Sequence, residues 1–104
     1  RTKVSHPSFI TQCVVNINGK ISLKAKPFDS IYLMGGNIAS INDTLYNLLT
    51  GESIMKSSNT MTSKNYLFVE NNTLSFTDKN NNVVNNDYGV YKINKLTLEI
   101  ERYE

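Results

Sequence analysis

The end of the chain alternates between apolar and polar residues. From residue 95 onward the apolar set falls on every second position, at Leu96, Leu98 and Ile100. Alternation with a period of two predicts a half-buried β-strand. With Asn94-Lys95 as a two-residue turn, Ile93 lies opposite Leu96 and Tyr91 opposite Leu98, so both strands of the predicted hairpin bury the same face.

A second hairpin is predicted with Asn71-Asn72 as its turn. Val69 then faces Leu74, and Leu67 faces Phe76, so the apolar side chains of both strands again lie on one side. This predicted hairpin, like the C-terminal one, buries a single face formed by both of its strands.

A third hairpin is predicted around Asn18-Gly19, the strongest short turn signal in the chain. A three-residue loop with the glycine in a bulge sets Val15 against Ile21 and Cys13 against Leu23, which keeps the apolar residues together. A two-residue loop would divide them between the faces. We therefore expect the bulged register.

The middle of the chain is less regular. The apolar run at residues 31–34 stops at Gly35-Gly36, which predicts another hairpin, and an unbroken run indicates burial on both faces or a tightly bent strand. Residues 43–50 fit either a short helix capped by Asp43 or a strand that turns at Thr50-Gly51. The all-β surroundings favour the strand.

These elements predict one all-β domain over residues 1–104. We expect an antiparallel meander of about seven or eight short strands, arranged as a closed or partly open barrel, with a sandwich as the second choice and at most one short helix near 43–50. Residues 1–8 are expected to form a loose N-terminal arm. Residues 57–63 and 78–87 are expected to be exposed loops, with a brief edge strand at Val83-Val84 in the second.

Composition narrows the classes of function. The formal net charge of +2 is too small to indicate a basic stripe, so a nucleic-acid partner is disfavoured. Cys13 is the single cysteine, which excludes an internal disulfide and a paired-cysteine metal or redox site. No run of about eighteen apolar residues is present, so the sequence predicts no membrane span.

The sequence offers no catalytic constellation. The single histidine, His6, lies next to Pro7 in the predicted arm, and Glu99 and Glu101 share what reads as an ordinary solvent-facing strand side. None of the glycine-rich phosphate loops, zinc-hydrolase strings or serine-nucleophile elbows occurs. We predict a protein that is not an enzyme and that uses no metal and no cofactor.

Aromatic residues opposite the core side of the predicted hairpins form the candidate site. They are Tyr66, Phe68, Tyr88 and Tyr103. Rings supply large contact area at low cost in conformational entropy, which suits a partner-binding surface. In a two-sheet or helix-covered arrangement the same residues would instead form a second core layer.

The function expected first is a binding or inhibitor domain that recognises a macromolecular partner, a protein above all, through sheet aromatics or loop tips. The plan of one short meander with an apolar terminal hairpin resembles the small periplasmic lysozyme-inhibitor barrels, which implies an exported bacterial protein. Those families commonly carry paired cysteines and a Ser-Gly-x-x-Tyr loop, whereas this chain has one cysteine and Thr50-Gly51-Glu52-Ser53. No residue role is therefore carried across.

The sequence leaves alternatives open for the cellular compartment and for the class of binding partner. Because the sequence begins at Arg1 without Met, we expect that it has been trimmed, either by a processing enzyme that removed an export signal or at a boundary chosen for expression. The lone cysteine suits the cytoplasm equally well. The second hypothesis is a cytosolic oligomerising or immunity-type protein that pairs an edge strand or its aromatic face with another chain, including a second copy of itself. The third is a barrel that binds single-stranded nucleic acid, with bases stacked on the aromatics and Lys20, Lys24 and Lys92 near the backbone.

Overall fold

A computed structural model of the chain describes residues 12–15, 21–26 and 28–103. Over these residues the protein is all-β and its strands pair antiparallel, which confirms the predicted fold class. No helix occurs in the described residues, and so none that could cross a membrane. The strands are β1 (Gln12–Val15), β2 (Ile21–Ala25), β3 (Ile31–Gly35), β4 (Ile38–Ile41), β5 (Thr44–Asn47), β6 (Ser53–Lys56), β7 (Thr60–Thr62), β8 (Tyr66–Asn71), β9 (Ser75–Thr77), β10 (Val83–Asn85), β11 (Gly89–Asn94) and β12 (Ile100–Arg102).

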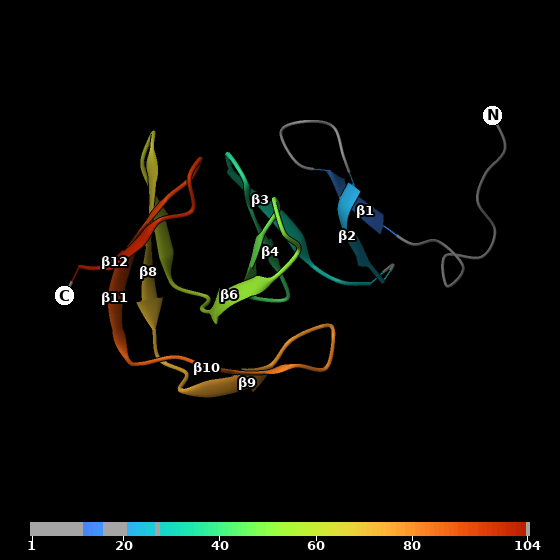
Figure 1. Cartoon of the computed structure of the whole chain (residues 1–104). Helices are drawn as coiled ribbons and strands as arrows, with labels where there is room; N and C mark the ends of the chain where they lie inside the picture. Colours follow the sequence, from blue (N-terminus) through green and yellow to red (C-terminus); the bar gives the residue numbers. More distant parts are fainter. Residues whose placement is uncertain (1–11, 16–20, 27, 104) are drawn as a thin grey trace, which may run out of the picture.

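Two four-stranded sheets stand face to face (Figure 1). We call the one ordered β12-β11-β8-β7 the outer sheet and the one ordered β3-β4-β5-β6 the inner sheet. The main core lies between them and consists of Ile38, Leu45, Met55, Leu67, Val69 and Ile93. Neither sheet closes into a barrel among the described strands, because no ladder joins an edge of one sheet to an edge of the other. The arrangement is a sandwich, the second of the two architectures that the sequence predicts.

The inner sheet is covered on both faces. All four residues of β4 are buried, with Ile38 facing the main core and Ala39 and Ile41 facing a second cluster on the other side. That second cluster includes Ala25 at the end of β2, and the β1–β2 hairpin lies on this side of the inner sheet (Figure 1). The chain thus has three layers, and the outer sheet is one of the two external ones.

Of the two alternatives for the apolar run of β3, burial on both faces is wrong. Tyr32 is 63% exposed and Leu33 71% exposed, because β3 is an edge strand of the inner sheet. The hairpin across Gly35-Gly36 is confirmed, and its ladder shifts register between Leu33 and Gly35. The run therefore belongs to an irregular edge, and it is the following strand that is buried on both sides.

The strand interpretation of residues 43–50 is confirmed, since β5 is followed by a turn and then by β6. The turn before β5 was missed by sequence reasoning. Asn42 and Asp43 have φ values of 52° and 67°, the two left-handed residues of a tight hairpin turn. Asp43 is thus a turn residue and not the cap of a helix.

The N-terminal hairpin follows the predicted register only in part. Val15 pairs with Ile21 as expected, but Cys13 pairs with Lys24 and not with Leu23. The ladder shifts by one residue between Val14 and Val15, so every pair farther from the turn differs from the predicted register. The loop at residues 16–20 and the expected arm at residues 1–8 lie outside the described residues, and so does His6.

The predicted hairpin around Asn71-Asn72 is wrong. Strand β8 pairs with β7 on one side and β11 on the other, so neither edge is free for β9, which pairs with β10. Asn71 ends β8 because its buried carboxamide donates to the Asp87 carbonyl and accepts from the Thr73 N–H. Leu74, expected in the core, is 48% exposed.

The C-terminal hairpin exists with a different register and a longer loop. Ile93 pairs with Ile100, and all three residues of β12 are exposed. The Asn94 carboxamide accepts hydrogen bonds from the N–H groups of Leu96 and Thr97, which coils the chain into a turn where a strand was expected. Leu96 is 56% exposed as a result. The alternating residues that predicted a half-buried strand from residue 95 onward therefore lie mostly in a turn.

Two segments expected to be loops contain short strands. Residues 57–63 include β7, which pairs with β8, and the Asn-rich stretch includes β10, the predicted edge strand at Val83-Val84. Asp78 organises the second segment by accepting hydrogen bonds from the N–H groups of Asn80 and Asn82. The asparagines there belong to a closed loop with defined hydrogen bonds.

Candidate binding surface on the outer sheet

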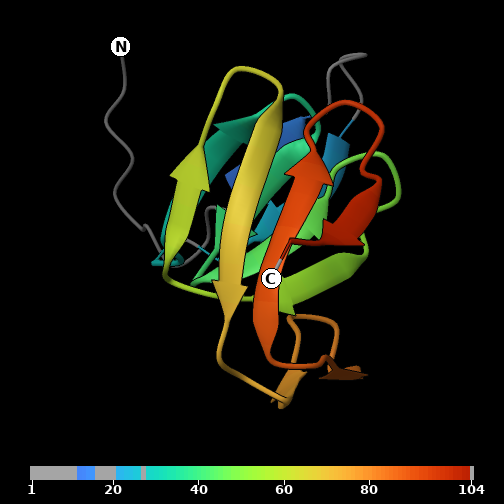
Figure 2. The same cartoon turned by 90° about the vertical axis from the view of Figure 1, so that its left-hand side faces the viewer.

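Strand β8 sets which side chains reach the external face of the outer sheet. Its residues alternate, with Leu67 and Val69 buried in the core and Tyr66 and Phe68 half-buried on the other side. Figure 2 looks onto this external face, with β8 and β11 at the centre of the sheet. The predicted division of β8 into a core side and an aromatic side is what the structure has.

Strand pairing lines up one row of side chains across the whole sheet. Phe68 on β8 pairs with Met61 on β7 and with Lys92 on β11, and Lys92 pairs with Glu101 on β12. Residues directly opposite in neighbouring strands lie close enough to interact. The external face therefore carries a continuous row that runs from an apolar end at β7 to a charged end at β12.

An aromatic pair lies at the centre of this face. The rings of Phe68 and Tyr103 meet edge to face, with centroids 5.1 Å apart and an interplanar angle of 66°. The Tyr103 N–H donates to the Val90 carbonyl at 2.7 Å, which fixes the chain just after β12 against β11. Tyr103 is 62% exposed and Met61 72% exposed. We call Met61, Phe68, Val90 and Tyr103 the apolar patch.

A charged cluster borders the apolar patch. The Lys92 ammonium lies 4.2 Å from the centre of the Tyr66 ring and 3.6 Å from a Glu101 carboxylate oxygen. The lysine is therefore held over the ring by a cation–π contact and an ion pair, each modest at an exposed site. Beside them is a hollow of 180 Å³ lined by Tyr66, Lys92, Asn94, Glu99, Ile100 and Glu101.

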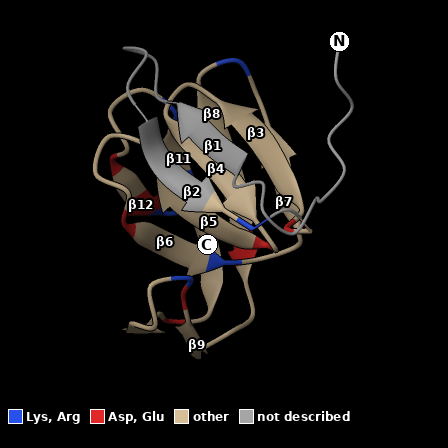
Figure 3. Cartoon of the chain, turned by 90° about the vertical axis from the view of Figure 1, so that its right-hand side faces the viewer, with Lys and Arg blue, Asp and Glu red and all other residues tan. Residues whose placement is uncertain are grey.

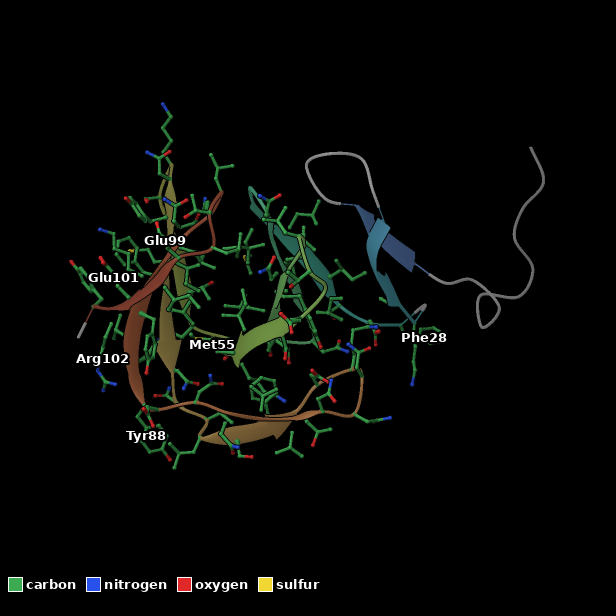
Figure 4. All side chains as sticks on the ribbon, viewed as in Figure 1. Phe28, Met55, Tyr88, Glu99, Glu101 and Arg102 are labelled. Atoms are coloured by element: carbon green, nitrogen blue, oxygen red, sulfur yellow. The ribbon has the colours of Figure 1, made fainter. Side chains whose placement is uncertain are left out.

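Acidic residues form the rim of this surface. Glu70, Glu99 and Glu101 are all exposed, and Glu99 and Glu101 line the same hollow as Tyr66 and Lys92. Figure 4 places Glu101 on the external side of the outer sheet, whereas Met55 lies between the sheets. The neighbouring cations are engaged, Lys92 with a carboxylate and a ring, and Arg102 with the Tyr88 carbonyl and the Tyr91 ring. The border of the apolar patch is thus negative in character.

Three of the four predicted site residues come together and the fourth does not. Tyr66, Phe68 and Tyr103 share the external face, whereas Tyr88 lies at the corner where the chain enters β11 (Figure 4). The Tyr88 carbonyl accepts a 2.6 Å hydrogen bond from Arg102. None of the three is covered by a further layer among the described residues, so they do not form a second core.

Sequence reasoning missed two members of the apolar patch, Val90 and, on a separate segment, Met61. Its segment, rich in Ser, Thr and Asn, was expected to be a loop, and Thr60-Met61-Thr62 is too short for alternation to be recognised. Only the pairing of β7 with β8 reveals that this methionine extends the aromatic row.

The pKa values of Asp29, Tyr46 and Asp78 are shifted by burial and by hydrogen bonds in the loops and the core. The side-chain hydrogen bond from Asn42, with a further one from the Lys26 N–H, lowers the pKa of Asp29. Burial raises the pKa of the Tyr46 hydroxyl. Burial also acts to raise the pKa of Asp78, but hydrogen bonds from Asn82, Asn80 and Ser53 outweigh it, and the net shift is downward.

The described residues contain no group of three or more His, Cys, Asp and Glu side chains placed to hold a metal ion. The external face offers apolar burial at the patch and charge pairing at its rim. No protein-family model matches the chain, and the searches of curated proteins and of solved structures found no match either.

Proposed function

We propose that the protein is a non-catalytic binding domain that recognises a macromolecular partner, most simply another protein, with the external face of its outer sheet. One observation carries the proposal. Met61 and Tyr103 remain 72% and 62% exposed on a sheet whose central strands pack their other side against the main core. Exposed apolar side chains gathered on one face and bordered by charge are typical of interaction surfaces.

The rim favours a protein over a nucleic acid. Glu70, Glu99 and Glu101 would repel a phosphate backbone at the place where bases would have to stack on the aromatics. The same carboxylates attract lysine and arginine side chains. The partner surface that fits best has an apolar centre and a basic border.

The rigidity of the face supports the proposal. Phe68 is fixed on a central strand, and Tyr103 is fixed by its own backbone bond and by the ring contact. Side chains that are already ordered before binding lose less entropy in the complex.

The test is a capture experiment with two charge-insertion variants. The protein is immobilised and exposed to lysate and culture medium of its source organism. A Met61→Lys/Tyr103→Lys variant is compared with a Tyr32→Lys/Leu33→Lys variant, in which equally exposed residues of the distant β3 edge are changed. A partner kept by the wild type and the β3 variant but lost by the patch variant supports the proposal. A partner kept equally by both variants contradicts it.

A second candidate function, self-association, is favoured by β3. This strand, Ile-Tyr-Leu-Met-Gly, has no charged residue, lies at a sheet edge among the described strands and exposes Tyr32 and Leu33. Such edges are templates for pairing with a second chain. Sedimentation equilibrium distinguishes this function, because the Tyr32→Lys/Leu33→Lys variant should then be monomeric at concentrations where the wild type and the patch variant are dimeric.

A further inference from the structure

Three hairpin turns meet at one end of the sandwich. They are the β3–β4 turn at Gly35-Gly36, the β7–β8 turn at Lys64-Asn65 and the β11–β12 turn at Lys95-Leu96. Between them is a hollow of 390 Å³, lined by these six residues together with Tyr66 and Asn94. Its volume is in the range of pockets that hold small molecules.

Hydrogen bonds across the turns hold this hollow in shape. The Lys95 N–H donates to the Asn65 carbonyl at 3.0 Å, and the Lys95 carbonyl accepts from the Asn37 N–H at 2.8 Å. The Asn37 carboxamide donates to the Leu96 carbonyl at 3.0 Å, and the Lys95 ammonium donates to the Ser63 carbonyl at 2.6 Å. The three turns are therefore tied to one another before any ligand arrives, which lowers the ordering cost of binding.

The lining of the hollow is basic. Lys64 and Lys95 both belong to it and no carboxylate does, whereas the two other hollows described on this chain include Asp43 and Glu70, or Glu99 and Glu101. Figure 3 shows basic colour without acidic colour on the β7–β8 turn at the top of the view. The glycines at positions 35 and 36 let Lys95 pack closely against this wall, with its side chain against Gly35 and its backbone carbonyl against Gly36.

The apolar part of the lining adds a second requirement for a ligand. Tyr66 contributes a ring and Leu96 an aliphatic side chain that is 56% exposed. We propose that this hollow is a binding site for a small organic oxyanion, in which the anionic group pairs with the two lysines and an aromatic or aliphatic body rests on Tyr66 and Leu96. The site does not depend on the binding role of the external face.

The experiment is a ¹H–¹⁵N NMR titration of the full chain with phenyl phosphate, benzoate, inorganic phosphate and, as a neutral reference, phenol. Phenyl phosphate or benzoate should shift the amide signals of Gly35, Gly36, Asn65 and Leu96 with a saturable dependence, and phenol should not. Binding of both anions assigns the site to oxyanions in general, and binding of one alone assigns it to phosphate esters or to carboxylates.

Two variants and one matched control make the result decisive. Lys64→Gln should weaken the anion by about fivefold, since a charge-assisted contact is lost at a partly exposed site. Lys79→Gln, an exposed lysine outside the lining of the hollow, should leave the affinity unchanged. Glu99→Gln, which removes a carboxylate from the neighbouring hollow, should tighten binding about twofold at low salt. Shifts spread over all lysine-bearing segments, or equal weakening by Lys64→Gln and Lys79→Gln, overturn the proposal.

Discussion

The backbone carbonyl of Lys95 accepts a 2.8 Å hydrogen bond from the N–H of Asn37, which joins a turn of the outer sheet to a turn of the inner sheet. Gly36 makes this approach possible. A Cβ at position 36 would overlap the Lys95 carbonyl group, whose carbon would lie 2.7 Å away. The junction of the two sheets at this end thus depends on a residue without a side chain.

Gly36→Ala should destabilise the protein by about 2–4 kcal/mol, because it combines steric overlap with a left-handed backbone at φ 56°. Gly51→Ala is the control, since Gly51 also has a positive φ of 81° but belongs to the β5–β6 turn. Urea unfolding of both variants measures the difference. Equal losses at the two positions would show that the contact with Lys95 contributes nothing.

Tyr46→Phe should cost roughly 1–2 kcal/mol, because the buried hydroxyl accepts a 3.1 Å hydrogen bond from the Lys79 N–H, which would lose its partner. The variant should also behave differently at alkaline pH. Burial raises the pKa of Tyr46 above its ordinary value of 10.0, so the stability that this tyrosine contributes is complete below pH 10.0 and is lost as the pH rises through the folded-state value. Unfolding curves between pH 7 and pH 11 should show the wild type and Tyr46→Phe converging; parallel curves would contradict the assignment.

Asp78→Asn should destabilise the protein by roughly 1–2 kcal/mol at neutral pH, since the carboxylate accepts from two backbone N–H groups and from the Ser53 hydroxyl. The pKa of Asp78 is lowered in the folded state from 3.8, so its contribution is present above pH 3.8 and is lost as the pH falls through the lower folded-state value. Asp87→Asn, at an exposed position, is the matched control. The two variants should differ in stability at pH 7 and approach each other near pH 2; a constant difference would argue against a role for the charge.

The sequence predicts the fold class because β-branched, apolar and aromatic residues alternate in many short segments. It fails where asparagine side chains compete with the ladder. At Asn94 the carboxamide binds the next N–H groups, and Leu98 then takes a left-handed φ of 65°, so the expected strand becomes a loop. At Asn71 the same competition ends β8. Alternation reports which residues could share a face, but it does not report local side-chain hydrogen bonds that stop a strand.

The candidate site was predictable to the extent that it rests on β8. Tyr66 and Phe68 alternate with buried residues inside one well-formed strand, so their shared face follows from the sequence alone. Tyr103 reaches the same face through the true register of β12, and Met61 does so through a strand of three residues. Their positions depend on tertiary pairing, which one sequence does not contain. The separation of Tyr88 from the others has the same origin.

Phe68 and Tyr103 should behave as a coupled pair. Single replacement of either by Leu removes the edge-to-face contact, so the double variant should cost less stability than the sum of the single variants by about 0.5–1.5 kcal/mol. Chemical denaturation of the four proteins in this cycle measures the coupling. Strict additivity would show that the ring contact contributes no energy to the face.

The most direct test of the proposed binding role uses two tyrosines of nearly equal exposure, Tyr103 at 62% and Tyr32 at 63%. The dissociation constant of the captured partner is measured by calorimetry for the wild type, Tyr103→Ala and Tyr32→Ala. A binding role for the external face predicts at least about tenfold weaker affinity for Tyr103→Ala and an unchanged affinity for Tyr32→Ala. Unchanged affinity for Tyr103→Ala, or a greater loss for Tyr32→Ala, would contradict it.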